Sequence, residues 1–339
     1  YLPMQSVDLS NITGWNLETL KSMAEKLPTV AKANLGTLNY YIRQHMVPHH
    51  GKAILSAMDY LATLPDLTEL DVTHAIFTQE EAEEFMNGLA KLTNLSSINM
   101  SGMSLFDTGL IQFGKAARQL PSLTKLDLSS PKTNDYNGNM QHMTWLGELN
   151  RLVDLKMASC GILKSDYEHM HWLASLQLPR LDLSNNYVDC LGEYMANNTS
   201  LESLSLFDGM VNTAALMQSL SSNLAIRRLS LVSVDINDER LVPICRWLKE
   251  HPNQLELLCL AHHAVRNLSP LAKVLKDNTS LTFLSISTVS LWTSVELNST
   301  VWKDFLETNT TLNTLLYNQV VFPEVVRNAI RNKTLQEYT

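Results

Sequence analysis

One stretch of nine residues limits what this chain can fold into more than any other feature. It runs from Leu178 to Asn186 and reads L-x-x-L-x-L-x-x-N. Leu181 and Leu183 are two residues apart, so a short strand places both side chains on one face. Asn186 follows where the chain must turn, and its amide can bond backbone groups that the turn leaves unpaired. The stretch therefore predicts a short strand with one buried face, followed by a turn.

The apolar part of this pattern recurs along the whole chain at intervals of 23 to 37 residues. Its starting positions are Met4, Val30, Leu67, Leu95, Leu123, Leu152, Leu178, Leu201, Ile226, Leu255, Leu281, Leu312 and Leu335. Between the starts, apolar residues follow helical spacing, and Thr78-Gln-Glu-Glu81 opens one such segment with a capping box. Further helices are expected at about 165–176, 237–250 and 268–276. A lone strand–helix unit cannot bury its leucines, whereas stacked units share a continuous core.

We therefore predict one α/β solenoid domain over residues 1–339, with about 12–13 repeats in a horseshoe. Parallel strands would form the concave face, and helices would form the convex face because helices are wider than the strand spacing. Two deviations from the regular repeat are expected to be loops, and insertions in repeats often carry binding. One is an enlarged repeat with an insertion at about 38–52; the other is a polar loop at about 130–139.

The units resemble leucine-rich repeats of the ribonuclease-inhibitor-like type. The resemblance rests on the L-x-x-L-x-L pattern and on the lead-in phrases that begin at Asn198, Asn278, Asn309 and Asn332, such as Asn198-Thr-Ser-Leu201. The final asparagine of the pattern is kept only at Asn186, with Cys160 as a plausible substitute. Other repeats carry Met103, Pro131, Gly209, Val234 or Val289 there, so the chain is a divergent member. Such repeats occur in cytosolic innate-immune receptors and in effectors of intracellular bacteria, which implies protein recognition.

Residues that alternate with the buried leucines should face the concave side. They are charged and mostly acidic in the first half of the chain, and small or apolar in the second half. We predict that they bind a partner protein, because four of them are apolar and expected to be exposed, which needs an explanation: Phe207, Leu257, Phe283 and Leu316. The alternative is a solvated face without a ligand. The predicted partner-binding residues are Glu69, Asp71, Asp127, Asp154, Lys156, Arg180, Asp182, Phe207, Arg228, Leu257, Cys259, Phe283 and Leu316.

Composition excludes several other classes of protein. A formal net charge of -8 argues against a nucleic-acid partner. No apolar run approaches the roughly 18 residues that would predict membrane insertion. Four scattered cysteines without a C-x-x-C pair favour a reducing compartment, so we expect a cytoplasmic protein, or one in the host cytosol if it is a secreted bacterial effector. The Asn-x-Ser/Thr sequences recur at one repeat position, so we interpret them as part of the repeat rather than as glycan sites.

No pattern indicates catalysis, a cofactor or a metal site. The chain lacks a Gly-rich phosphate loop, G-x-S-x-G and H-E-x-x-H. His45, His49 and His50 could suggest metal ligands, but Pro48 interrupts the helix that would align His45 with His49, and a surface loop is the better interpretation. Cys259 has no predictable base nearby that would make it a nucleophile.

The sequence thus predicts a non-enzymatic protein–protein interaction module, for example a bacterial effector or an adaptor. Two alternatives follow from the resemblance. One is the ligand-sensing domain of a cytosolic innate-immune receptor. The other is the substrate-recognition domain of a ubiquitin ligase whose catalytic domain lies outside this chain. The oligomeric state is left open.

Overall fold

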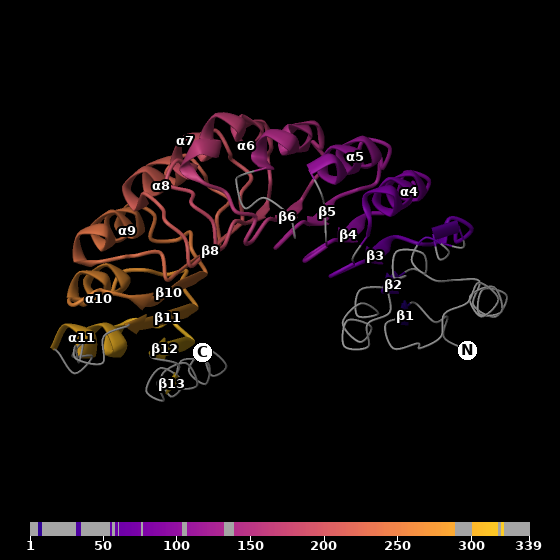
Figure 1. The fold of residues 1–339 in the computed structure, drawn as a ribbon. Helices are drawn as coiled ribbons and strands as arrows, with labels where there is room; N and C mark the ends of the chain where they lie inside the picture. Colours follow the sequence, from indigo (N-terminus) through magenta and orange to yellow (C-terminus); the bar gives the residue numbers. More distant parts are fainter. Residues whose placement is uncertain are drawn as a thin grey trace, which may run out of the picture. The chain divides into compact units, whose positions relative to one another are not determined.

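The structure is a computed structural model, and it describes residues 6–8, 32–34, 55, 58–59, 61–75, 77–103, 107–131, 139–288, 300–317 and 320–321. The chain divides into two compact units, Tyr1–Leu176 (unit 1) and Gln177–Thr339 (unit 2). Both units consist of short strands that alternate with helices, and the helices lie along one side of each sheet (Figure 1). We call the opposite side of each sheet its open face.

Unit 1 contains six parallel strands among its described residues, paired in chain order. Each strand is three residues long, and its first, second and third residues face those of the next strand. The elements in order are β1 (Ser6–Asp8), β2 (Lys32–Asn34), β3 (Glu69–Asp71), α4 (Gln79–Leu89), β4 (Ser97–Asn99), α5 (Asp107–Ala117), β5 (Lys125–Asp127), the 3₁₀ helix η1 (Asn139–Glu148), β6 (Asp154–Lys156), the 3₁₀ helix η2 (Lys164–His169) and α6 (His171–Ser175).

Unit 2 has the same alternation of strands and helices, and its strands β8 to β12 are longer than those of unit 1. The strands β7 to β12 pair in parallel in chain order, and β13 pairs antiparallel with β12. The elements in order are β7 (Arg180–Asp182), α7 (Leu191–Met195), β8 (Ser203–Phe207), α8 (Thr213–Leu220), β9 (Arg228–Val232), α9 (Asp238–Glu250), β10 (Leu257–His263), α10 (Ser269–Leu275), β11 (Phe283–Thr288), α11 (Thr300–Thr308), β12 (Thr314–Tyr317) and β13 (Val320–Val321).

The repeat pattern predicted the strands and their orientation correctly. Each predicted start from Met4 to Leu312 is followed two residues later by a parallel strand. In the repeats that start between Leu67 and Leu312, the fourth residue of the pattern points into the core, as Leu126 in unit 1 (2% exposed) and Leu258 in unit 2 (0% exposed) show. The predicted α/β leucine-rich-repeat architecture is thereby confirmed within each unit, with parallel strands on one side and helices on the other.

A left-handed residue ends the strand segment of successive repeats. His74 has φ 60°, Ser130 φ 52° and Asn185 φ 56°, and each is the eighth residue of its repeat pattern. This conformation turns the chain toward the helix side, while the residue's N–H still donates to the next repeat. The N–H of Asn185, for example, donates to the carbonyl oxygen of Phe207 at 2.5 Å. The turn therefore extends the ladder by one bond beyond the regular strands.

The helix predictions were largely confirmed. Thr78 caps α4 and forms the expected capping box with Glu81. The segment at 237–250 forms α9, capped by the Asn237 side chain, which accepts a hydrogen bond from the N–H of Arg240 at 2.9 Å. The prediction of one helix at 165–176 was wrong. The chain forms η2 and the short α6 instead, because Met170 between them has a non-helical backbone (φ -92°, ψ 6°) and is fully buried.

Several predictions fall on residues outside the described part of the chain. These are the insertion at about 38–52, the middle of the polar loop (132–138), the histidine run and the thirteenth start at Leu335. The end of the polar loop is described, since η1 begins at Asn139. The division into one domain stays a prediction.

Candidate functional site

The predicted partner-binding residues of unit 1 lie in two rows across the open face. Strand register places Lys125 opposite Asp154 and Asp127 opposite Lys156. The Lys156 ammonium lies 3.9 Å from a carboxylate oxygen of Asp127. The rows also include Glu69 and Asp71 on β3. Lysines on neighbouring strands therefore lie opposite two of the carboxylates in this zone.

The aspartates at the third strand position have a structural role. Carboxylate oxygens of Asp71, Asp127 and Asp182 accept the backbone N–H two residues later, at 2.9 Å, 3.0 Å and 3.0 Å. Asp71 and Asp182 also accept the hydroxyls of Thr73 and Ser184, both at 2.6 Å. These contacts form Asx turns that open the bend after each strand. Local turn formation therefore accounts for aspartate at these positions without any ligand.

In unit 2 the predicted residues again form rows on the open face. The first row is Arg180, Ser203, Arg228, Leu257, Phe283 and Thr314, and the second row is Asp182, Ser205, Ser230, Cys259, Ser285 and Leu316. Phe207 and Val232 form part of a third row. Phe207 is 45% exposed, whereas Leu257, Phe283 and Leu316 are less exposed, each being half-buried. The expectation that all four are exposed was thus wrong for three of them, because adjacent strands about 4.8 Å apart cover the flanks of each side chain.

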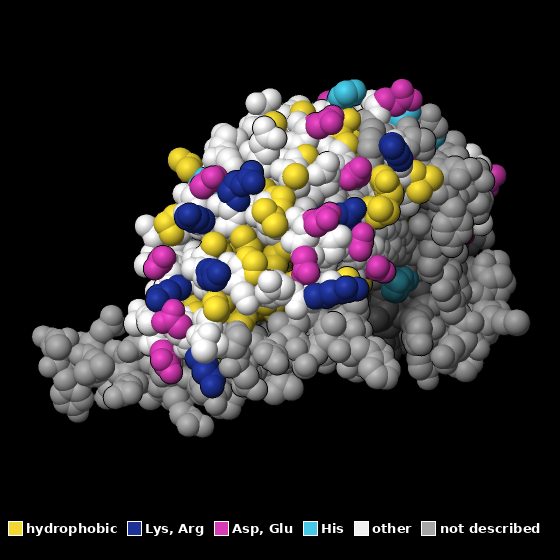
Figure 2. Space-filling model, turned by 90° about the vertical axis from the view of Figure 1, so that its left-hand side faces the viewer, with side chains coloured by type: hydrophobic (Ala, Val, Ile, Leu, Met, Phe, Trp, Pro, Cys, Tyr) yellow, Lys and Arg dark blue, Asp and Glu magenta, His cyan; other side chains and the backbone are white. Residues whose placement is uncertain are grey.

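Arg228 differs from the other charged residues of this face. Its side chain is exposed and makes no ion pair or hydrogen bond with any described residue. Its register neighbours Ser203 and Leu257 are uncharged. Figure 2 views the molecule from the side where α9 and α10 lie in Figure 1, and there Lys, Arg, Asp and Glu side chains are interspersed with apolar ones. An arginine without a carboxylate partner beside apolar side chains is therefore an anchor suited to an incoming acidic group.

Three different side chains fill the ninth position of the repeat pattern with the same chemistry. The amide nitrogen of Asn186 donates to the carbonyl oxygens of Leu183 (3.0 Å) and Ser184 (3.1 Å). The Cys160 thiol donates to the carbonyl of Leu128 at 3.4 Å, which confirms it as a substitute for asparagine. His263 is the third such residue, and sequence reasoning missed its role. Its position, eight residues after Leu255, was the available signal.

His263 is fully buried and links two repeats. One ring nitrogen lies 2.6 Å from the carbonyl oxygen of Leu231, and the other accepts the N–H of Ile236 at 3.4 Å. Since a carbonyl can only accept, Nε2 carries the proton and the ring is neutral. Burial, which disfavours the imidazolium, lowers the pKa of His263, and the bond to the Leu231 carbonyl opposes this. The preceding residue, His262, is exposed.

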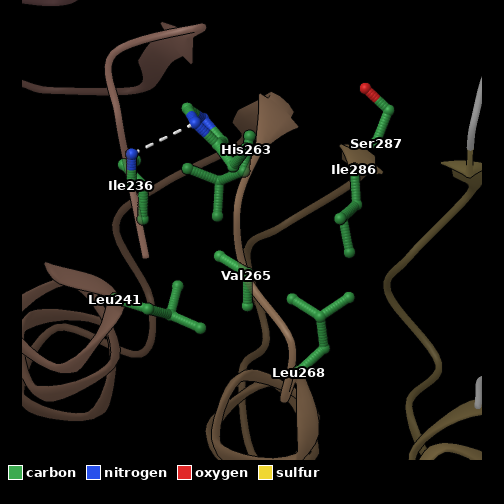
Figure 3. Close-up of a pocket in the computed structure, with 8 residues that line it drawn as sticks. Ile236, Leu241, His263, Val265, Leu268, Ile286 and Ser287 are labelled. Atoms are coloured by element: carbon green, nitrogen blue, oxygen red, sulfur yellow. Dashed lines mark hydrogen bonds between the residues drawn. The ribbon is translucent and has the colours of Figure 1, made fainter. Parts of the chain in front are cut away.

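A cavity of about 10 Å³ lies beside the His263 ring. Its walls are apolar apart from His263 and Ser287, and Val265 and Leu268 lie below the ring (Figure 3). This volume is close to the least that holds one water molecule. The cavity is therefore a packing gap and too small for a ligand.

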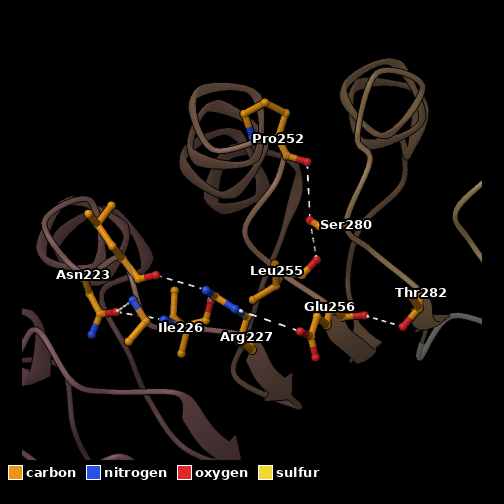
Figure 4. Close-up of polar contacts among 10 residues, drawn as sticks. Asn223, Ile226, Arg227, Pro252, Leu255, Glu256, Ser280 and Thr282 are labelled. Atoms are coloured by element: carbon orange, nitrogen blue, oxygen red, sulfur yellow. Dashed lines mark hydrogen bonds and ion pairs between the residues drawn. The ribbon is translucent and has the colours of Figure 1, made fainter.

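Buried asparagines join several repeats of unit 2 at the lead-in position, three residues before the pattern starts Leu201, Ile226, Leu281 and Leu312. The Asn223 oxygen accepts the N–H groups of Ala225 and Ile226, both at 2.8 Å (Figure 4). Its amide donates to the carbonyl of Asn198 at 2.9 Å. Gln254 donates in turn to the carbonyl of Asn223 at 2.6 Å. Asn309 repeats the arrangement with the carbonyl of Asn278. Unit 1 has leucines at this position, for example Leu92, so its repeats close without this row.

The lead-in row also explains several Asn-x-Ser/Thr sequences. Asn198 and Asn278 are 2% exposed, and Asn309 is 9% exposed. An oligosaccharide could not be attached to these side chains in the folded protein, because their amides lie inside it. The interpretation of these sequences as part of the repeat is confirmed at these positions, whereas Asn94 and Asn197 are exposed.

The cysteines show no sign of paired or activated thiols. Cys160, Cys190, Cys245 and Cys259 form no disulfide. Burial disfavours the thiolate and raises the pKa of Cys245 to about 12, so this thiol is a poor nucleophile. Cys259 is half-buried in the second row of the open face.

The described residues contain neither a metal-binding cluster nor a membrane-spanning helix. Within them, His, Cys, Asp and Glu side chains do not gather in any group of three that could hold a metal ion. None of the described helices has both the length and the apolar character that crossing a bilayer requires.

Comparison with known proteins concerns the fold. No family model matches the sequence, and no curated protein matches it. Among solved structures, an internalin C2 of Listeria monocytogenes is similar at 16% identity and a TM-score of 0.42, over 68% of this chain and 84% of that one. An internalin, inlF, of the same species is similar at 19% identity and a TM-score of 0.46, over 80% and 81%. The leucine-rich-repeat fold of each unit stands on its own strand register and buried leucine rows.

Proposed function

We propose that this chain is a non-enzymatic protein-recognition module and that it binds a partner protein on the open face of unit 2. The observation that carries the proposal is the apolar character of that face. Phe207 is 45% exposed, and half-buried Leu257, Phe283 and Leu316 lie on neighbouring strands. Large apolar side chains that remain partly exposed on a folded sheet commonly mark an interaction site.

The rigidity of the face favours binding. Its side chains stand on strands held by parallel pairing on both sides and by the buried lead-in asparagines beneath the strand starts. A surface that is ordered before the encounter loses little conformational entropy on association. The same scaffold would serve an effector, an adaptor, a sensing domain or a substrate-recognition domain. The identity of the bound partner would show which of these four roles the protein has.

We also propose a reducing compartment, either the cytoplasm or, for a secreted bacterial effector, the host cytosol. All four cysteines are thiols rather than disulfides, which supports this proposal. In unit 1, Asx turns and neighbouring lysines engage several carboxylates, so we place the main binding surface in unit 2 rather than on the acidic rows.

The test compares two triple variants. The first carries Phe207→Ser, Leu257→Ser and Phe283→Ser on the open face; the matched control carries Ile111→Ser, Leu224→Ser and Val242→Ser at exposed apolar positions outside the strands. A partner captured by the wild type from cytosolic lysate would be purified and titrated by calorimetry. We expect at least about a tenfold weaker Kd for the first variant, equivalent to the loss of about 1.4 kcal/mol, and no change for the control. Equal binding by all three proteins, or no captured partner, would refute the proposal.

A further inference from the structure

We propose that the open face of unit 2 recognises an extended protein segment in which an aspartate or glutamate lies two to three residues from a bulky apolar side chain. This inference rests on the proposed function and names the chemistry of the partner. It stands on the juxtaposition of Arg228, which has no partner among the described residues, with Leu257 and Phe283 on the two following strands.

The charge of the segment follows from Arg228. A guanidinium presents several N–H donors in a plane and pairs best with a carboxylate. The residues around it on the face are Ser203, Ser205, Ser230 and Leu257, none of which offers a carboxylate. The nearby Arg227 is already engaged, since it lies 4.0 Å from Glu256 and donates to the Leu224 carbonyl (Figure 4). Arg228 is therefore left for an acidic group from outside this face.

The spacing within the segment follows from the strand register. Arg228, Leu257 and Phe283 are register partners on β9, β10 and β11. Neighbouring strands are about 4.8 Å apart, so Phe283 lies about 10 Å from Arg228 along the row. An extended segment advances about 3.3 Å per residue, so a segment that crosses the strands passes Leu257 after about one to two residues and reaches Phe283 after about three. A carboxylate on Arg228 then brings an apolar side chain over Leu257 and Phe283.

The neighbouring rows leave space for such a side chain. The second row has small residues at Ser230, Cys259 and Ser285, and the third row presents Phe207 and Val232. Larger side chains therefore flank a row of small ones, and an apolar group can contact both sides. A second copy of this chain, a basic segment and an uncharged apolar segment are the competing occupants.

A peptide-display selection on the full chain tests the proposal. A library of random 12-residue peptides would be selected against the wild type, Arg228→Glu and Arg246→Glu. The last variant is the matched control, because Arg246 is an exposed arginine on α9, away from the strands. We expect wild type and control to enrich peptides with Asp or Glu two to three residues from Leu, Ile, Phe or Trp. Arg228→Glu should enrich Lys or Arg in place of the acid and keep the apolar residue.

Affinity then separates this inference from the proposed function. Enriched peptides should bind Arg228→Glu at least about tenfold more weakly than the wild type, as expected for loss of a charge-assisted hydrogen bond. A second outcome is that the wild type enriches peptides without an acidic residue and that these peptides do not bind the Phe207, Leu257 and Phe283 triple variant. This outcome would overturn the inference of an acidic partner, but it would support the open face as the binding site. Enriched peptides that bind this triple variant as tightly as the wild type would overturn both proposals, as would a wild-type selection that enriches nothing above background. Enrichment of sequences from the chain itself would assign the face to self-association and also overturn the acidic partner.

Discussion

The sharpest test of how unit 2 is held together is replacement of Asn223 by alanine. The Asn223 side chain is 0% exposed and makes three hydrogen bonds to backbone groups, at 2.8, 2.8 and 2.9 Å. The substitution leaves the N–H of Ile226 and the carbonyl of Asn198 buried without this partner, while the half-buried N–H of Ala225 can reach water. At about 1–3 kcal/mol for each buried unsatisfied group, the variant should lose about 2–6 kcal/mol of stability.

Two other Asn→Ala variants calibrate this magnitude. Asn212 is exposed and caps α8 through one bond to the N–H of Ala215, so Asn212→Ala should cost only about 1 kcal/mol. Asn278 accepts two backbone N–H groups, but its buried amide nitrogen has no partner among the described residues. Asn278→Ala should therefore cost less than Asn223→Ala, because it also removes an unsatisfied donor.

The assay combines a global and a local measurement. Urea denaturation gives the change in unfolding midpoint, and hydrogen exchange of the Ile226 amide reports the local bond even if the repeat array does not unfold in one step. Asn223→Ala should lower the midpoint most and accelerate exchange at Ile226. If Asn223→Ala and Asn212→Ala unfold at the same urea concentration, the buried asparagine row does not stabilise unit 2 as argued here.

Two further predictions follow from buried contacts in unit 2. Burial lowers the pKa of His263 below its unfolded value of about 6.5, so the stability that the neutral ring contributes should be fully present above that pH and should be lost as the pH falls through the folded-state pKa. Between pH 7.5 and 5, the urea midpoint should therefore decline less for His263→Asn than for His262→Asn or the wild type. Equal declines in all three proteins would contradict this prediction. Gly192→Ala should destabilise the folded protein by about 1–3 kcal/mol, because the new Cβ would lie 2.6 Å from the Ala215 carbonyl carbon. A thermal melt indistinguishable from that of the wild type would contradict this and would show that α7 can shift to make room.

The periodic pattern alone predicted the strands, their direction and the inward residues. This was possible because strand alternation and repeat stacking depend only on local spacing. Leu258 and Leu126 are buried and Phe207 is exposed as the pattern required, and the capping box at Thr78 formed as written in the sequence. Each of these features is set within a few residues of chain.

Contacts between repeats are a different matter, because they join residues some 25 to 32 positions apart. The sequence pattern did not show that His263 would act like Asn186, or that lead-in asparagines would bind the carbonyls of the preceding repeat. It also indicated a charged row without showing that Asp71 and Asp127 form Asx turns. Whether a polar side chain closes a turn, joins a repeat or remains available to a partner is decided by which backbone groups the tertiary structure brings within hydrogen-bond distance. Only that structure shows Arg228 without a partner on its face.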